Sequence, residues 1–148
     1  VCALLPCDVS SHNAGCGGWI GGRWVPLPWV VAERPSAHVC GTAAVDSIQF
    51  RAPAKGNDTL LFNLSLNRSW GSSMEIGAKV EAENSYTGET RHILSAFFTF
   101  VALDEHGKPV EVPQIIPETE DQKRRYAKAQ IRREGRLRTR DELSKASG

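Results

Sequence analysis

The sequence predicts one α+β domain, an antiparallel sheet followed by a basic C-terminal helix. Two observations predict the sheet: runs of β-forming residues lie close together between residues 42 and 103, and turn sequences separate the longer ones. A third observation predicts the helix, because a helix-capping pattern follows residue 118. The 148 residues suit a single core of modest size. We divide the chain into a sheet domain at 1–118 and a basic helix with its tail at 119–148.

The predicted strands follow from the alternation of apolar and polar side chains. Four runs of residues predict them, at 42–50, 59–67, 73–83 and 91–103. The first run is rich in β-formers, and the next two alternate in polarity. The last is apolar on both faces through its Phe-Phe-Thr-Phe stretch, which is typical of an inner strand covered on both sides. Turn sequences at 86–89 and 104–107 favour antiparallel pairing.

The segment 117–143 has the character of a helix. Thr119 and Gln122 form a capping-box pattern, and acidic side chains lie in or near the first turn. Between residues 123 and 140 there are nine Lys or Arg residues and a single acid, Glu134, although the whole chain carries a net charge of only +1. Few apolar side chains interrupt this basic run. We therefore expect the helix to lie across a surface rather than to be buried.

Residues 1–41 are the least regular part of the sequence. Glycines crowd into 15–22, and Pro26 and Pro28 follow closely. A proline inside a helix costs on the order of 3 kcal/mol, so the sequence argues against a long helix across 15–28. It allows a short helix at 29–34.

The sequence excludes several classes of protein. It contains no run of about 18 apolar residues and no signal-peptide pattern, so we expect no membrane span and a cytoplasmic protein with reduced thiols. The basic run suits a polyanion, but the strands lack the exposed aromatic pairs of an RNA-reading sheet, so no nucleic-acid partner is predicted. No metal site is predicted either, because no standard zinc spacing fits Cys2, Cys7, His12 and Cys16.

Four segments of the chain resemble the hotdog-fold acyl-CoA thioesterases, in particular the cytosolic acyl-CoA hydrolases. They are 42–50 (TAAVDSIQF), 72–77 (SSMEIG), 95–101 (SAFFTFV) and 113–125 (PQIIPETEDQKRR). Their order and spacing also fit the family. The resemblance implies a hotdog fold, a curved antiparallel sheet around a central helix. It also implies a homo-oligomer built from hotdog dimers, often assembled as a trimer of dimers.

The resemblance further implies hydrolysis of fatty acyl-CoA thioesters to free acid and CoA, with no cofactor besides the CoA of substrate and product. A thioester carbonyl is already electrophilic, so the enzyme needs an acid or an Asn to orient water and backbone N–H groups to stabilise the oxyanion. Gly17-Gly18 matches the family's oxyanion-stabilising Gly-Gly, although a tight turn is the generic alternative. Asn13 stands in for the family's catalytic Asn if a short deletion is allowed.

The residues that match the family's CoA-binding positions form three groups. They are Ala43, Ala44 and Val45; Ser72, Ser73 and Met74; and Arg132 and Arg133. The resemblance implies that the first group lines the CoA channel, the second clamps the nucleotide end and the third reaches the phosphates, which arginine pairs with well. The residues alone support a different interpretation, in which Met74 faces the core, the two serines form a turn and the arginines belong to a solvated face.

The match fails at the two positions where relatives carry working groups. Aligned without gaps, the catalytic Asn falls on Ser10 and the family's helical acid on Val25, and the nearest later carboxylate is Glu33. Three explanations stay open: a diverged module, a different backbone path, or a reading-frame error in this stretch. We expect an acyl-CoA thioesterase. The alternative is a catalytically inactive hotdog module that binds acyl-CoA or serves assembly only.

Overall fold

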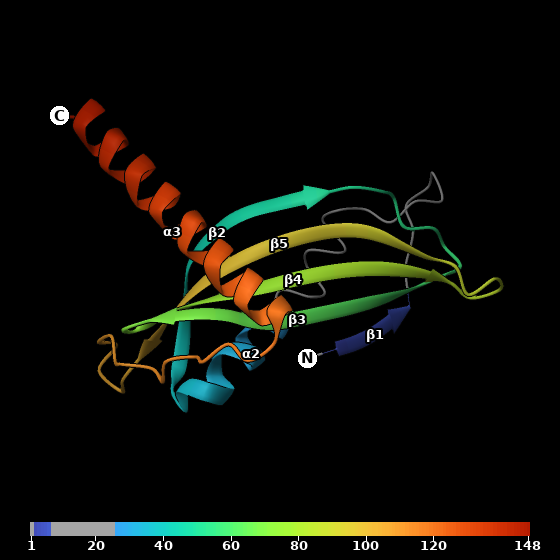
Figure 1. Ribbon diagram of the computed structural model, residues 1–148, viewed down its shortest axis with the longest axis horizontal. Helices are drawn as coiled ribbons and strands as arrows, with labels where there is room; N and C mark the ends of the chain where they lie inside the picture. Colours follow the sequence, from blue (N-terminus) through green and yellow to red (C-terminus); the bar gives the residue numbers. More distant parts are fainter. Residues whose placement is uncertain (1, 7–25) are drawn as a thin grey trace.

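The computed structural model describes the backbone of residues 2–6 and 26–148, and side chains from residue 28 onward (Figure 1). Two helices and five strands make up these parts of the chain. In order they are β1 (Cys2–Pro6), α2 (Pro26–Ser36), β2 (Val39–Phe50), β3 (Asp58–Trp70), β4 (Ser73–Asn84), β5 (Thr90–Leu103) and α3 (Glu120–Ala146). No helix in the described parts is long and apolar enough to cross a membrane.

The five strands form one antiparallel sheet in the order β1-β3-β4-β5-β2. All four predicted strands are confirmed, and each extends past its predicted run by one to three residues at one or both ends. Both predicted turns are also confirmed, with Gly88 at φ 71° and Gly107 at φ 73°, which favours glycine. The fifth strand, β1, was not predicted. It has five residues, too few to show a periodicity, and its pairing partner β3 lies far along the chain.

One face of the sheet carries the apolar core. β3, β4 and β5 contribute alternate side chains that are buried: Leu60, Phe62, Leu64, Met74, Ile76, Ala78, Val80, Ala82, Leu94, Ala96, Phe98, Phe100 and Ala102. The helix α2 packs on this face, touching β2 through β5 and burying Val31 and Ala32. The apolar half of the strand alternation therefore faces α2.

The short helix allowed at 29–34 is confirmed as part of α2, whereas most of the stretch 15–28, where no long helix was expected, lies outside the described residues. α2 begins at Pro26 and continues to Ser36, so both prolines lie in its first turn. The first four N–H groups of a helix have no acceptor within the helix, and a proline there loses no hydrogen bond. Both prolines are therefore compatible with α2 as described.

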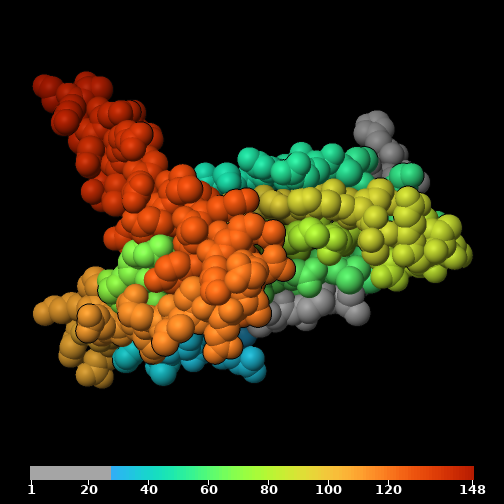
Figure 2. Space-filling model, viewed as in Figure 1, coloured from blue at the N-terminus to red at the C-terminus, as the bar shows by residue number. Residues whose placement is uncertain are grey.

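The helix α3 crosses the opposite face of the sheet, as predicted for a basic surface helix (Figure 1). Its predicted capping box is present: the Thr119 hydroxyl accepts from the Gln122 N–H at 3.2 Å, and the Gln122 side chain accepts from the Thr119 N–H. Ala129 is its only buried residue. Its last turns project beyond the sheet (Figure 2). Our division of the chain at residue 118 stays a prediction.

Candidate functional site

The face of the sheet under α3 is polar, and a buried carboxylate lies at its centre. Glu75 is fully buried, and Arg132 of α3 donates to it through Nε at 3.0 Å and Nη2 at 2.6 Å. The Asn67 amide donates a third hydrogen bond at 2.9 Å, and the Arg132 guanidinium lies 3.7 Å from the centre of the Phe97 ring. A buried carboxylate is tolerated when it is paired with a cation and hydrogen-bonded. This network holds the middle of α3 on the sheet.

Two further arginines of α3 continue the same contact. Arg133 donates to the Ser73 hydroxyl at 3.2 Å and lies over the Trp70 ring at 4.7 Å. Partial burial, followed by repulsion from neighbouring arginines, lowers the pKa of the Arg133 guanidinium. Arg136 donates from Nη1 to both carboxylate oxygens of Asp46 in β2, at 2.8 and 2.7 Å. The helix is thus tied to both β4 and β2.

A groove of about 610 Å³ runs between β2 and the second half of α3. We call it the β2–α3 groove; its lining is Ala44, Val45, Asp46, Ser47, Arg132, Gly135, Arg136, Thr139, Arg140 and Leu143. The pairing of β2 with β5 shifts register on both sides of Ala44 and Val45, which leaves Ala43 and Asp46 without ladder partners. A bulge of this kind redirects side chains, and Asp46 points to Arg136. The bulges thus shape the wall of the groove.

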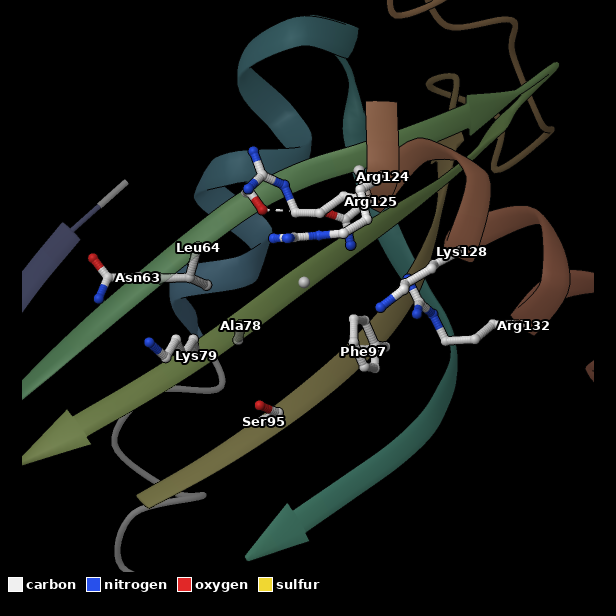
Figure 3. Close-up of a pocket in the computed structure, with 13 residues that line it drawn as sticks. Asn63, Leu64, Ala78, Lys79, Ser95, Phe97, Arg124, Arg125, Lys128 and Arg132 are labelled. Carbon is white, nitrogen blue, oxygen red and sulfur yellow. Dashed lines mark hydrogen bonds between the residues drawn. The ribbon is translucent and has the colours of Figure 1, made fainter. Parts of the chain in front are cut away.

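A second hollow of about 400 Å³ lies between the first half of α3 and strands β3 to β5 (Figure 3). We call it the basic cavity. Its lining is Asn63, Leu64, Ser65, Asn67, Gly77, Ala78, Lys79, Ser95, Phe97, Arg124, Arg125, Lys128 and Arg132. It has five cationic side chains and no Asp or Glu among these residues. Arg132 borders both hollows and separates them.

The structure brings together some of the predicted CoA-binding residues. Ala44, Val45 and Arg132 line one groove, and Arg133 contacts Ser73. Ala43 is exposed on β2. Ser72 is half-buried in the turn just before β4, and its carbonyl accepts from the Ala102 N–H. By contrast, the Met74 side chain is 1% exposed and points into the core on the other face of the sheet. Its side chain is therefore not part of either hollow on the α3 face.

The predicted catalytic residues Asn13 and Gly18 lie outside the described residues, as do Gly17, Ser10 and Val25. His12 and the cysteines at 7 and 16, which fit no zinc pattern, lie outside them too. The first turn of α2 holds no acidic residue, and Glu33 is exposed further along the helix.

Sequence reasoning missed the carboxylates that hold α3. The alternation of polarity in the run 73–83 puts Glu75 on the polar side of its strand, which is right, but α3 covers that side. One signal was present: Lys128, Arg132 and Arg136 are spaced four apart and so share one face of the helix. The carboxylate partners of Arg132 and Arg136 lie 57 and 90 residues away in the chain, and no local sequence pattern shows such pairs.

Comparison with known proteins decides the family. A profile of the thioesterase superfamily matches residues 29–89. The uncharacterised acyl-CoA thioester hydrolase YkhA of Bacillus subtilis is 35% identical over 119 residues, covering 80% of this chain and 69% of that protein. The chain belongs to the thioesterase superfamily. The resemblance to acyl-CoA thioesterases is thereby confirmed.

Solved structures of acyl-CoA hydrolases share this thioesterase's fold. The acyl-CoA hydrolase of Staphylococcus aureus, solved with butyryl-CoA, CoA and CoA disulfide, gives a TM-score of 0.89 at 26% identity, covering 99% of this chain and 91% of that one. A hexameric acyl-CoA thioesterase gives 0.88 at 31% identity, covering 94% and 91%. The hotdog fold is confirmed.

Proposed function

We propose that this thioesterase hydrolyses acyl-CoA thioesters to a carboxylic acid and CoA. The observation that carries the proposal is the match over 99% of the chain to a hydrolase whose structure holds butyryl-CoA and CoA. The β2–α3 groove adds support, because it gathers Ala44, Val45 and Arg132, three of the residues that the resemblance assigns to CoA. The reaction needs no cofactor beyond the CoA of the substrate, and we expect it to serve fatty-acid metabolism.

Each predicted residue has a defined task in this proposal. Asn13 orients the attacking water, and the N–H of Gly18 stabilises the oxyanion that forms on the thioester carbonyl. The edge of β2 at residues 43–45 and the start of β4 at residues 72–74 hold the CoA. Arg133 is well placed for a phosphate, because it reaches Ser73 and carries no carboxylate partner among the described residues.

We infer further that the chain works as a hotdog dimer, assembled as a trimer of dimers, in the cytoplasm. β2 is an edge strand, and its apolar side chains Val45, Ile48 and Phe50 are 46–57% exposed. An exposed apolar edge strand invites pairing with another copy. The hexameric relative supports the higher assembly.

Release of the free CoA thiol from acyl-CoA substrates of several chain lengths tests the activity. We expect turnover by the intact chain and a loss of at least about tenfold in kcat for Asn13→Ala. Asn57→Ala is the matched control, because Asn57 is exposed in the turn before β3. Folded protein that releases no thiol from any chain length contradicts the proposal.

One observation favours an inactive hotdog module as the second candidate. The first turn of α2 carries prolines and no acid, where relatives keep a carboxylate close by. An inactive module binds acyl-CoA in calorimetry and releases no thiol. Turnover above the buffer rate that is lost in Asn13→Ala rejects this candidate.

A further inference from the structure

The basic cavity carries more positive charge than its surroundings neutralise. Three of its five cations have carboxylate partners: Arg132 has Glu75 at 2.6 Å, Lys79 has Glu81 at 2.8 Å and Arg124 has Asp121 at 3.0 Å. Arg125 and Lys128 pair with no carboxylate among the described residues. They are three residues apart on α3, so both lie on the side that meets the sheet. Two uncompensated charges therefore meet at one hollow.

The opposite wall of the basic cavity is polar, and its hydroxyls already have partners: Ser65 donates to the Asn67 amide oxygen at 3.0 Å, and Ser95 is bonded to His92 Nε2 at 2.8 Å. β5 contributes the Ser95 hydroxyl, β3 contributes the side chains of Asn63 and Ser65, and Figure 3 shows these strands facing α3 across the hollow. Phe97 forms an apolar floor between them. The volume of about 400 Å³ lies within the range of small-molecule sites. A ligand here meets cations on one side and, on the other, the Asn63 amide, which has one N–H bonded to Glu81.

This set of groups matches a phosphate monoester better than a carboxylate. A phosphate monoester carries close to two negative charges at neutral pH and three terminal oxygens. The planar guanidinium of Arg125 suits two of those oxygens, and the ammonium of Lys128 suits a point contact. The Asn63 amide donates one N–H to Glu81 at 3.3 Å and has a second N–H for the third oxygen.

We propose that the basic cavity binds a phosphate monoester group, with Arg125 and Lys128 as its principal ligands. This site differs from the β2–α3 groove, from which the Arg132–Glu75 pair separates it. Because Arg132 is ion-paired with Glu75, we expect the phosphate to contact the two unpaired cations of the preceding turns, Arg125 and Lys128. The group comes either from the 3′-phosphate of CoA or from a free phosphorylated small molecule.

Calorimetric titration of the full chain with inorganic phosphate, CoA and dephospho-CoA tests the proposal. The variants are Arg125→Gln, Lys128→Gln and the double substitution. Lys123→Gln is the matched control, because Lys123 lies on the same helix but pairs with Glu120 and does not line the cavity. We expect the dissociation constant for phosphate to rise at least about tenfold in the double variant, the effect of losing charge-assisted hydrogen bonds. The control keeps the affinity of the parent chain.

The two CoA compounds identify the source of the group. If the 3′-phosphate of CoA occupies the cavity, CoA binds more tightly than dephospho-CoA, and the double variant removes the difference. If phosphate binding depends on Arg125 and Lys128 while the two compounds bind equally, the cavity serves a free phosphorylated molecule. Absence of phosphate binding in the parent chain, or equal binding by the parent and a double variant of unchanged circular dichroism, overturns the proposal. None of these readouts requires thioester hydrolysis.

Discussion

The two faces of the sheet hold their helices by different physical means. On the α2 face, side chains such as Phe62 and Ile76 are fully buried among other apolar groups. On the α3 face, the contacts are ion pairs and cation–π stacks, centred on Glu75 and Arg132. The strand β4 contributes side chains to both faces, because successive side chains along a strand point to opposite sides.

The difference teaches where this fold leaves room for ligands. Apolar burial is non-directional and closes space, since a protein core packs as densely as an organic crystal. Arginine contacts are directional and reach across a gap, so the α3 face keeps the β2–α3 groove and the basic cavity open. Stability comes mainly from the first face, and the proposed binding sites lie on the second.

The largest effect we expect is on the α2 face. Phe62→Ala deletes a fully buried ring and leaves a cavity, so the free energy of unfolding falls by about 4 kcal/mol. Chemical denaturation measures the change. Tyr86→Ala, at a side chain that is largely exposed, shifts it by no more than about 0.5 kcal/mol. Similar effects of the two substitutions would show that Phe62 does not lie in a tightly packed core.

A smaller loss follows from Glu75→Gln on the α3 face. The amide keeps the shape of the side chain but leaves the Arg132 cation without its carboxylate, which costs about 2 kcal/mol because Arg132 still reaches water. Replacing both Glu75 and Arg132 by Met removes the two desolvated charges together. We expect the free energy of unfolding of this double variant, measured by denaturation, to regain most of that loss. A double variant as unstable as the sum of its single substitutions shows that the two residues are not coupled.

Gly77→Ala probes how tightly the same network is packed. A Cβ built at Gly77 lies 2.6 Å from Asn67 Nδ2, so the amide must move away from Glu75, at a cost of about 1 to 2 kcal/mol. Gly135→Ala is the matched control, because nothing lies within 4 Å of a Cβ there and alanine favours the helix. Denaturation midpoints should move in opposite directions for the two variants. Movement in the same direction argues against the clash.

Asp46→Asn should have the smallest effect. Arg136 and Asp46 are both partly reached by solvent, so losing the pair costs about 1 kcal/mol. At 1 M salt, where the Debye length is about 3 Å, the loss should shrink. The loss from Phe62→Ala persists at the same salt concentration. A salt-independent loss at Asp46 would mean that its hydrogen bonds, rather than its charge, hold α3.

Sequence patterns predicted the elements that depend on near neighbours. The four main strands, both turns and the capping box of α3 follow from spacings of two to four residues. They missed β1, which exists only through its pairing with β3.

The candidate site shows the same limit. Resemblance picked out Ala44, Val45 and Arg132, and the structure places them around one groove. It also picked out Met74, whose side chain the pleat of β4 turns into the core. No pattern marked Arg125 and Lys128 apart from the other cations of α3. Only the fold shows that the three other cations of the basic cavity pair with carboxylates, while these two pair with none among the described residues.

By itself, the sequence determined the strand periodicity, the capped basic helix and the thioesterase family, because each rests on residues read along the chain. Only the tertiary structure decided which charges meet. Arg132 pairs with Glu75, 57 residues away in the sequence, and Arg136 pairs with Asp46, 90 residues away. The energy of an ion pair depends on the distance between the charges in space and not on their separation in sequence. The pairing of these arginines is what sets the groove apart from the cavity.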